Sequence, residues 1–244
     1  MSISERQKEI LRLLEGRSYI TVQELSALTF TSASSIRRDL TYLENNGLVK
    51  RLHGGVSTIL PTANVASFYD RTHKNVKEKR AIAQKASALL RDGQTLLLDS
   101  STTVTFLLPY IARHSGMTVF TNNLTTALQD IELGIPTHCL GGHAIHGSTA
   151  LSGPETFAAL AGITVDLLFF SSQSLDDHGI ISDSTQEENH VRQLMLEHAK
   201  TRVFLCDSEK FRSRNTYTLC HLDRIDHADF DLPYPDLNTQ CKIL

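Results

Sequence analysis

The chain has 244 residues, of which 41% are hydrophobic and 21% charged, an ordinary globular composition for one large domain or a small domain joined to a larger one. No stretch approaches the roughly 18 consecutive apolar residues of a membrane span, and the polar N-terminus "MSISERQKEI" has no apolar signal core. These features lead us to expect a protein with no membrane partner. The four cysteines form no C-x-x-C pair, so we expect reduced thiols and a cytoplasmic location.

Charge is unevenly distributed behind the net value of −3. Residues 1–91 contain 15 Lys and Arg against 8 Asp and Glu, whereas residues 92–244 contain 9 and 19. A basic front end on an acidic body indicates that only the front meets a polyanion. An accident of composition is the alternative.

Two helices are predicted at the start of the chain. Residues 4–14 place apolar side chains on one face between charges, with Ser4 as N-cap. After a short extended link, Thr21 and Glu24 fit a capping box that opens a second, shorter helix.

A third helix and a hairpin follow. Thr31 or Ser32 caps the helix, which runs to about Asn46, and Gly47 suits its left-handed end. The stretch "LVKRLHGGVSTI" then predicts two strands with a turn at Gly54 and Gly55.

Two helices joined by a tight turn, after one helix and before a hairpin, are typical of a winged helix-turn-helix, here expected at residues 1–58. In such a module the N-terminal turn of the second helix of the pair lies closest to the DNA bases. Arg37 and Arg38 point about 100° apart, so one can face bases and the other a phosphate strand. Asp39 is expected to brace an arginine or to face away from DNA. The predicted DNA-binding residues are Ser32, Ser34, Ser35, Arg37 and Arg38 on the helix and Lys50, Arg51 and His53 on the wing.

The same residues also fit a purely structural alternative to DNA binding, namely a three-helix packing domain with a charged exposed face. The hairpin, the serine-rich helix start and the basic charge together favour DNA binding.

The body of the chain predicts an α/β domain at residues 77–244, after a polar linker at 59–76. A helix from residue 77 is followed by apolar runs such as "QTLLLD", "MTVFTN", "VDLLFFSS" and "RVFLCD", which alternate with helical patterns. In "TTVTFLLPYIAR" we expect Pro109 to break or bend the helix. Strands alternating with helices predict a mostly parallel sheet.

Polar residues follow several of these strands, where ligands bind in parallel sheets. Hydroxyls and free N–H groups at a helix start favour an anion, Asp99 and Asp207 suit sugar hydroxyls, and Lys210 suits a phosphate or an opened sugar oxygen. Ordinary helix capping is a compatible reading of the same hydroxyls. The predicted effector-binding residues are Asp99, Ser100, Ser101, Thr102, Thr103, Thr121, Asn122, Asn123, Asp207 and Lys210.

One histidine-rich segment raises the question of a metal. His138, Cys139, His143 and His146 lie close together in sequence, but their spacing matches no closed structural zinc site. We expect loop histidines beside a ligand cleft and neither a metal nor another cofactor.

A family resemblance covers most of the chain. The segment "ITVQELSALTFTSASSIRRDLTYLENNGLVKRLHGGV" closely resembles the DNA-binding domain of the DeoR family of bacterial transcriptional repressors, with Arg-Arg-Asp-Leu at residues 37–40 and His-Gly-Gly at 53–55. "KEKRAIAQKA", "LLLDSSTT", "TNN" and "DSEKF" follow in the order of the family's effector domain. The resemblance implies a fold similar to sugar-phosphate isomerases and deaminases, which senses a phosphorylated sugar and then releases DNA. It adds Gly141, Gly142, Glu188 and Arg192 to the expected effector-binding residues.

Several positions depart from the family pattern. Ser101, Ser171 and Ser174 stand where glycines are usual, Ile145 stands where a basic residue is frequent, and Arg192 replaces a common lysine, which keeps the charge but not the shape. These departures indicate a divergent ligand or a weakened sensor.

Two functions follow from these patterns. The first is a repressor of carbohydrate-metabolism genes that binds double-stranded operator DNA and a sugar phosphate or related metabolite, as a homo-oligomer (a dimer or tetramer), since operators are normally read by symmetric dimers. The second is a sugar-phosphate isomerase-like enzyme with an accessory DNA-binding domain, whose candidate acids and bases are Asp99, Asp183, Glu188 and Lys210. The departures weaken the second, so we expect a regulator that is not an enzyme.

Overall fold

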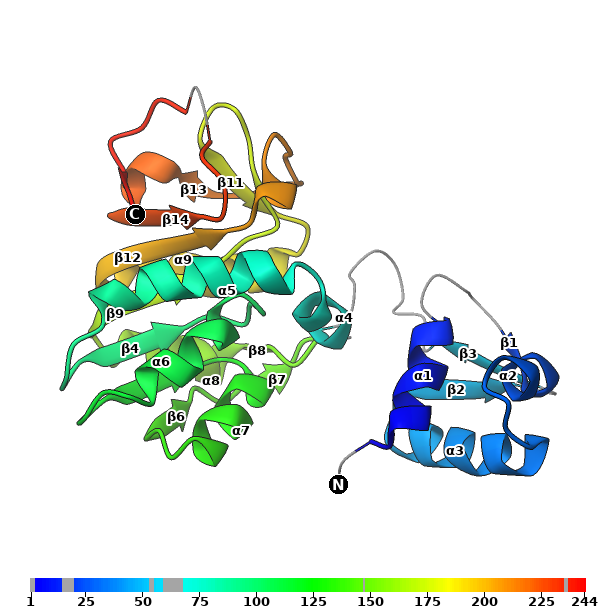
Figure 1. Ribbon diagram of the computed structural model, residues 1–244. Coiled ribbons are helices and arrows are strands. Elements are labelled where there is room, and N and C mark those ends of the chain that lie inside the picture. Colours follow the sequence, from blue (N-terminus) through cyan, green and yellow to red (C-terminus); the bar gives the residue numbers. More distant parts are fainter. Residues whose placement is uncertain (1–2, 15–19, 53–54, 59–67, 147, 235–236) are drawn as a thin grey trace. The chain divides into compact units, whose positions relative to one another are not determined.

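The computed structural model spans residues 1–244 and describes all of them except 1–2, 15–19, 53–54, 59–67, 147 and 235–236. The chain divides into two compact units, Met1–Val65 and Ala66–Leu244 (Figure 1). Among the described residues, no helix is both long enough and apolar enough to cross a membrane.

The N-terminal unit packs three helices with a small antiparallel sheet of order β1-β3-β2. Its elements are α1 (Glu5–Leu14), β1 (Ile20–Thr21), α2 (Val22–Leu28), α3 (Ala33–Asn45), β2 (Val49–Leu52) and β3 (Gly55–Thr58). The apolar stripes of all three helices meet in one core, where Ile10, Leu25, Ile36 and Leu40 are fully buried. This is the predicted winged helix-turn-helix.

Local side-chain bonds explain where the helices begin and end. Thr21 and Glu24 form the predicted capping box at the start of α2. Ser32, one of the two caps considered, accepts from the backbone N–H of Ser35 at the start of α3. Gly47, at φ 68°, follows the end of α3 in the left-handed conformation that glycine adopts without strain.

The C-terminal unit is built on a seven-stranded parallel sheet of order β15-β14-β12-β9-β4-β5-β6. Its strands are β4 (Thr95–Leu98), β5 (Thr118–Thr121), β6 (Thr137–Cys139), β9 (Val165–Phe170), β12 (Ala199–Cys206), β14 (His227–Phe230) and β15 (Lys242–Ile243). On β9, Leu168 and Phe170 join one buried cluster while Leu167 and Phe169 join another. Burial on both faces explains the uninterrupted apolar runs and confirms the α/β class.

Helices cover both faces of this sheet (Figure 1). They are α5 (Val76–Ala86), α6 (Leu108–Ile111), α7 (Leu124–Glu132), α8 (Pro154–Ala161) and α9 (Gln186–Glu197), with 3₁₀ turns η1 (Ser87–Leu89), η2 (Val104–Leu107), η3 (Ser208–Lys210) and η4 (Leu222–Arg224) elsewhere in the unit. Helix α4 (Phe68–His73) lies beside the start of α5 and not over a face of the sheet (Figure 1). Because the parallel strands share one direction, their carboxyl ends gather the loops after β4, β9 and β12 at one edge.

Three features differ from the expectations. Helix α4 lies inside the segment predicted as a linker. Pro109 does not break a helix but stands in the first turn of α6, where a backbone N–H is not needed. Two small antiparallel sheets, too short for a periodic signal, were not predicted: β7 (His143–Ala144) with β8 (Leu151–Ser152), and β10 (Ser174–Leu175), β11 (Ile180–Asp183) and β13 (Tyr217–His221).

Candidate functional site

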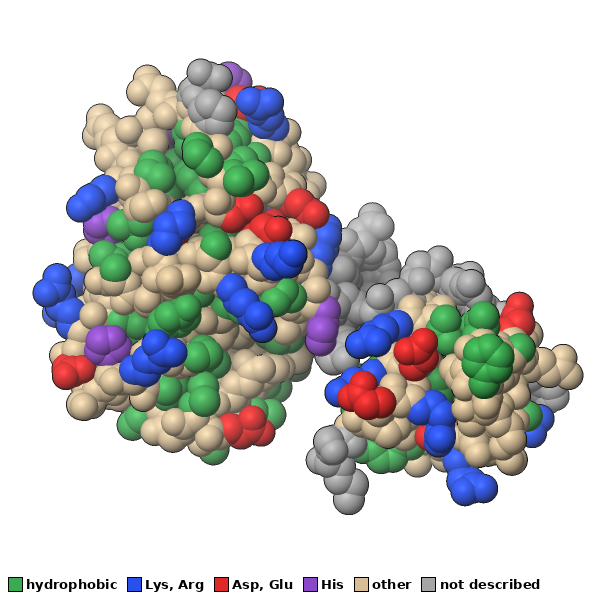
Figure 2. Space-filling model, in the orientation of Figure 1, with side chains coloured by type: hydrophobic (Ala, Val, Ile, Leu, Met, Phe, Trp, Pro, Cys, Tyr) green, Lys and Arg blue, Asp and Glu red, His purple; other side chains and the backbone are tan. Residues whose placement is uncertain are grey.

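Helix α3 presents a basic face to solvent. Arg37 and Arg38 are exposed, whereas their neighbours Ile36, Asp39 and Leu40 are buried. Within the described parts of the chain, neither guanidinium has a hydrogen bond or ion pair. Figure 2 shows Lys and Arg side chains at the surface of this unit around α3. Both arginines are therefore available to a polyanion.

Three serines form one hydroxyl cluster at the first turn of α3. The Ser32 hydroxyl lies 3.0 Å from that of Ser34 and donates to Ser35 Oγ at 3.1 Å. These side chains are small, so a nucleic-acid backbone can approach the free N–H groups of the helix start closely.

Asp39 braces an arginine, as one of the two expectations held, but the arginine belongs to α1. Arg6 Nε donates to Asp39 Oδ2 at 2.5 Å, and Gln7 Nε2 donates to Asp39 Oδ1 at 3.2 Å. This bond pair fixes α1 against α3 and leaves Arg37 and Arg38 without a carboxylate partner.

The wing is tied to α3 by Arg51. Its Nη1 donates to Thr41 Oγ1 at 2.9 Å, and its backbone N–H donates to Glu44 Oε1 at 3.0 Å. Lys50 pairs with Ser57 across the hairpin. His53 lies outside the described residues.

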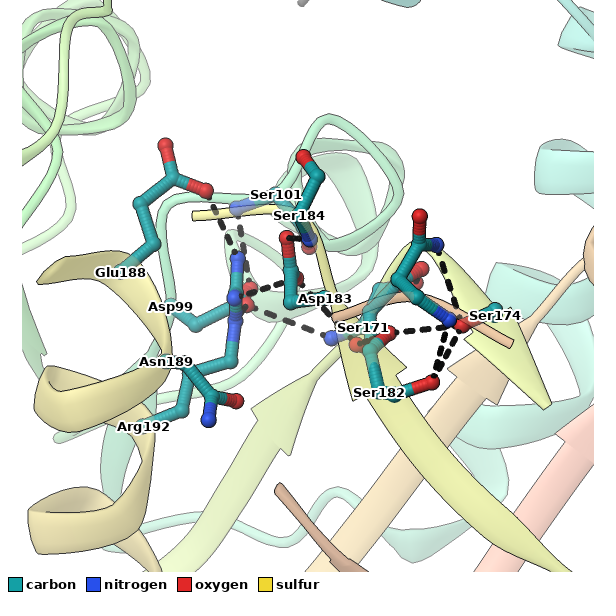
Figure 3. Close-up of polar contacts among 12 residues, drawn as sticks. Asp99, Ser101, Ser171, Ser174, Ser182, Asp183, Ser184, Glu188, Asn189 and Arg192 are labelled. Carbon is teal, nitrogen blue, oxygen red and sulfur yellow. Dashed lines mark hydrogen bonds and ion pairs between the residues drawn. The ribbon is translucent and has the colours of Figure 1, made fainter. Parts of the chain in front are cut away.

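In the C-terminal unit, three carboxylates surround the buried guanidinium of Arg192 (Figure 3). Arg192 Nε donates to Asp99 Oδ2 at 2.8 Å, Nη1 to Asp183 Oδ2 at 2.7 Å and Nη2 to Glu188 Oε2 at 3.3 Å. Each of the four side chains is at most 4% exposed. Burial acts to lower the pKa of Arg192, but the carboxylates outweigh it and raise that pKa above its usual range. With three acids on one base, negative charge is in excess here.

Three elements supply this acidic cluster. Asp99 follows β4, Asp183 ends β11, and Glu188 lies one helical turn before Arg192 on α9. Asp99 also accepts from the backbone N–H of Ser101 at 3.0 Å, which orients the serine-rich turn. Asp183 was expected only as a catalytic candidate, and the structure brings it together with the predicted effector residues.

A second cluster, of cations, lies around Lys79 of α5. Lys79 is 4% exposed, and its ammonium donates to Thr102 Oγ1 at 3.1 Å and to the backbone carbonyl of Arg71. Burial, followed by the charge of Lys210, lowers the pKa of Lys79 to about 8. Both hydrogen-bond acceptors of Lys79 are neutral, so its charge is not compensated by a direct bond.

Asp207 is the carboxylate of this cationic cluster. Lys210 Nζ lies 3.1 Å from Asp207 Oδ2, and Asn75 Nδ2 donates to Asp207 Oδ1 at 3.0 Å. Burial acts to raise the pKa of Asp207, but Lys210 and Asn75 outweigh it and leave that pKa lowered.

Ser171, which directly follows β9, joins the two clusters. Its hydroxyl accepts from Lys210 Nζ at 2.9 Å, and its backbone N–H donates to Asp99 Oδ2 at 3.3 Å. The glycine expected here from the family resemblance would supply no such hydroxyl. One continuous hydrogen-bond network therefore has a negative and a positive end.

Buried polar atoms without hydrogen-bond partners lie on the loops after β4, β5 and β11 and on α9. Figure 3 shows Ser101 and Ser184 beside Asp183. An unsatisfied buried polar atom costs about 1–3 kcal/mol, which favours a ligand that supplies hydroxyls. The atoms without partners are Ser101 Oγ, Asn122 Oδ1, Ser184 Oγ, Thr185 Oγ1 and Asn189 Oδ1.

Other predicted effector residues have structural bonds. Asn123 caps α7 by accepting from the Thr126 N–H at 3.0 Å, so the helix-capping alternative holds there. Its Nδ2 donates to the Ser100 carbonyl at 3.3 Å, and Thr121 Oγ1 accepts from its N–H at 3.1 Å. Thr103 is buried at the start of η2.

The two predicted glycines have structural roles in the backbone. The Gly141 carbonyl accepts from Thr156 Oγ1 at 2.6 Å. Gly142 has φ 106°, and a Cβ there would overlap Thr156 and the Ser152 carbonyl. Their conformation, independently of any ligand, requires glycine.

Sequence reasoning missed Lys79, Asn75 and Arg71 at the cationic cluster. A signal for Lys79 existed, because it lies three and four positions before Ile82 and Ala83 on the apolar face of α5. A lysine on a buried helical face requires hydrogen-bond acceptors for its ammonium, and Thr102 and the Arg71 carbonyl provide them.

For the histidine-rich segment, the structure shows His138 stacked on Phe120 with ring centroids 4.8 Å apart. Among the described residues, no group of three or more His, Cys, Asp or Glu side chains is placed to hold a metal ion.

Two domain models of one protein family match the chain, one for each unit. Residues 6–62 match the DeoR-like helix-turn-helix domain, and residues 74–229 match the DeoR C terminal sensor domain. The HTH-type transcriptional regulator GolR of Listeria innocua is 32% identical over 91% of this chain and 88% of its own length. The lactose phosphotransferase system repressor of Staphylococcus aureus is 29% identical over 95% and 93%. Among solved structures, ribose 5-phosphate isomerase A of Methanocaldococcus jannaschii is 14% identical, with a TM-score of 0.43 over 57% of this chain and 55% of that one.

Proposed function

Because the chain belongs to the DeoR family of transcriptional regulators, we propose that it is a repressor that binds double-stranded operator DNA and releases it when a metabolite binds the C-terminal unit. Its genes are proposed to serve carbohydrate metabolism, which the name of the lactose phosphotransferase system repressor supports. The free arginines and the serine cluster of α3 support the DNA-binding role.

The hydrogen-bond network with one negative and one positive end is the observation that carries the effector assignment. Carboxylates around Arg192 suit the hydroxyls of a polyol, and the cations around Lys79 suit an anionic group. Ser171 joins both ends through direct hydrogen bonds. A single small molecule with hydroxyls at one end and a phosphate at the other satisfies both, so we propose a sugar phosphate.

We propose that the C-terminal unit does not catalyse isomerisation. A carboxylate base must be free to take a carbon-bound proton. Asp99, Asp183 and Glu188 each accept from the guanidinium of Arg192, and Lys210 is bound to Asp207 and Ser171. A carboxylate held by a guanidinium is a weak base.

We propose a cytoplasmic homo-oligomer, a dimer or tetramer, as the acting form. A symmetric dimer matches the two half-sites of an operator. Helix α7 supports this proposal because Leu124, Leu128 and Ile131 are 43%, 64% and 68% exposed at helical spacing.

The proposed function is tested by binding of the full chain to the DNA upstream of its own gene, across salt concentrations and with a panel of sugar phosphates. We expect specific binding at nanomolar concentration with a steep salt dependence, because phosphate contacts release counterions. At least one sugar phosphate should weaken it, while the free sugar does not. Turnover of a sugar phosphate without specific DNA binding would overturn the proposal.

A further inference from the structure

Helix α4 contributes a cation to the cationic cluster. Arg71 Nε is buried and has no hydrogen-bond partner, and among the described residues no carboxylate pairs with this guanidinium. Its charge lies close enough to Lys79 to disfavour the protonated form of that lysine. Of the three cations Arg71, Lys79 and Lys210, only Lys210 has a direct ion pair in the cluster, with Asp207. Lys79 is buried and Arg71 is half-buried, and a buried cation without an anion is costly.

The segment that carries Arg71 is bound to α5 at one point and to the loop after β12 at two points. Lys79 donates to the Arg71 carbonyl, Asn75 donates to Asp207 at 3.0 Å, and Lys74 Nζ lies 2.6 Å from Glu209 Oε2. Figure 1 shows α4 beside the start of α5.

Asn75 shows that this junction is built for contact with the site. It has φ 54°, the left-handed region that asparagine tolerates. It stands at the N-cap of α5, yet its side chain makes no cap bond and instead reaches Asp207. The Asn75 side chain therefore does not cap α5 but connects the end of α4 to the loop after β12.

We propose that Arg71 and Lys79 together hold the anionic group of the effector, so that α4 is part of the ligand site. This inference rests on the proposed function. Lys79 now divides its donors between the Thr102 hydroxyl and the Arg71 carbonyl. A phosphate is a stronger acceptor than a carbonyl, since its hydrogen bonds are charge-assisted.

Ligand binding therefore draws Lys79 away from the Arg71 carbonyl and engages the Arg71 guanidinium instead. The two states hold α4 by different bonds, and the ligand favours one of them. That differential contact is what a ligand needs to shift a conformational equilibrium. Residues 59–67 connect α4 directly to the N-terminal unit in the chain, so α4 is the element through which the effector acts.

The test uses the full chain and inorganic phosphate as the probe, measured by calorimetric titration at constant ionic strength. Arg71→Gln should weaken phosphate binding about tenfold or more, the effect of one charge-assisted hydrogen bond. Arg80→Gln, the same change at an exposed residue next to Lys79 on α5, should leave it within about twofold of wild type. Lys79→Met removes the other cation and should act like Arg71→Gln.

Hydrogen exchange tests the coupling. Phosphate should change the exchange of the α4 amides, residues 68–73, in the wild type and in Arg80→Gln but not in Arg71→Gln. Phosphate affinity unchanged in Arg71→Gln, or α4 exchange unaffected by phosphate in the wild type, overturns the inference. These measurements involve no DNA. If the wild-type protein binds phosphate as expected but shows no specific operator binding, only the proposed function is overturned. If it represses but does not bind phosphate, only the inference is overturned.

Discussion

The guanidinium of Arg192 donates at 2.7 Å to a carboxylate oxygen of Asp183, nine positions earlier in the chain and on a separate strand. The pair is buried together with Asp99 and Glu188. Arg192 therefore holds β11, α9 and the loop after β4 in one arrangement, and it sets the shape of the acidic end of the ligand site.

Removing this guanidinium should strongly destabilise the C-terminal unit. Arg192→Met leaves three buried carboxylates facing one another, and the expected loss in free energy of unfolding is about 3–5 kcal/mol. Arg192→Lys keeps the charge but cannot donate in three directions, so a smaller loss is expected. Urea unfolding followed by circular dichroism measures both, since the chain has no tryptophan.

Arg224→Met is the matched control for this measurement. Arg224 forms an exposed ion pair with Glu197 at 2.8 Å, which should contribute less than about 1 kcal/mol. A loss in Arg192→Met no larger than in Arg224→Met would show that the buried network contributes nothing special.

Much of the fold could be predicted from the sequence because the signals are local. The capping box of Thr21 and Glu24 lies within four residues, and the apolar strands show their burial on both faces through composition alone. Asp99 was predictable as a site residue, since a polar residue after a buried strand lies at the ligand-binding edge of a parallel sheet.

The rest depends on contacts between distant segments. Asp99 and Arg192 are 93 positions apart, and nothing local shows that α9 returns to the loop after β4. Asp183 belongs to a four-residue strand of a small sheet, which is too short for a periodic signal. Lys79 lies on the apolar face of α5, which indicates burial, but the sequence does not show that its acceptors are Thr102 and the Arg71 carbonyl.

The two arginines of α3 should carry operator recognition. Arg37→Ala and Arg38→Ala should each lose operator binding while effector binding is retained, because both side chains lie on the unit that does not contain the ligand site. A base-reading arginine contributes about 1–3 kcal/mol of discrimination, whereas a phosphate-contacting one lowers the salt slope by about one. Competition binding with altered operators across salt assigns the two roles.

Arg12→Ala tests whether loss of charge alone explains the result. Arg12 is an exposed residue of α1 and should leave operator affinity within about threefold. Unchanged affinity in both α3 variants would mean that α3 is not the recognition helix.

Gly142 should tolerate no side chain. At φ 106° its Cβ would overlap the Thr156 hydroxyl and the Ser152 carbonyl, so Gly142→Ala should cost more than about 2 kcal/mol through overlap and backbone strain. Gly134→Ala is the control, because Gly134 has φ 73° with open space around its Cβ and should lose only about 1–2 kcal/mol of conformational strain. Equal losses in thermal unfolding would show that the contact with Ser152 and Thr156 relaxes freely.

Asp130 should make the stability of the C-terminal unit depend on pH. This carboxyl of α7 is fully buried, and burial raises its pKa from 3.8 to about 6. The folded state then binds the proton more tightly than the unfolded state, so this residue's contribution is fully present below about pH 4, falls as pH rises through about 6, and is constant above that. Asp130→Asn removes the dependence and should stabilise the protein by up to about 3 kcal/mol at pH 8, with little effect at pH 4.

Asp223→Asn should have the opposite effect on the pH dependence of stability. Thr239 and the Gln240 N–H lower the pKa of that exposed carboxyl, so its bonds stabilise the fold above the usual aspartate pKa and are lost as pH falls. Its removal should therefore lower stability at neutral pH. Urea unfolding of the wild type, Asp130→Asn and Asp223→Asn between about pH 4 and 8 distinguishes the two opposite effects on the free energy of unfolding. If the stability gained in Asp130→Asn does not grow with pH, burial does not raise the pKa of this carboxyl.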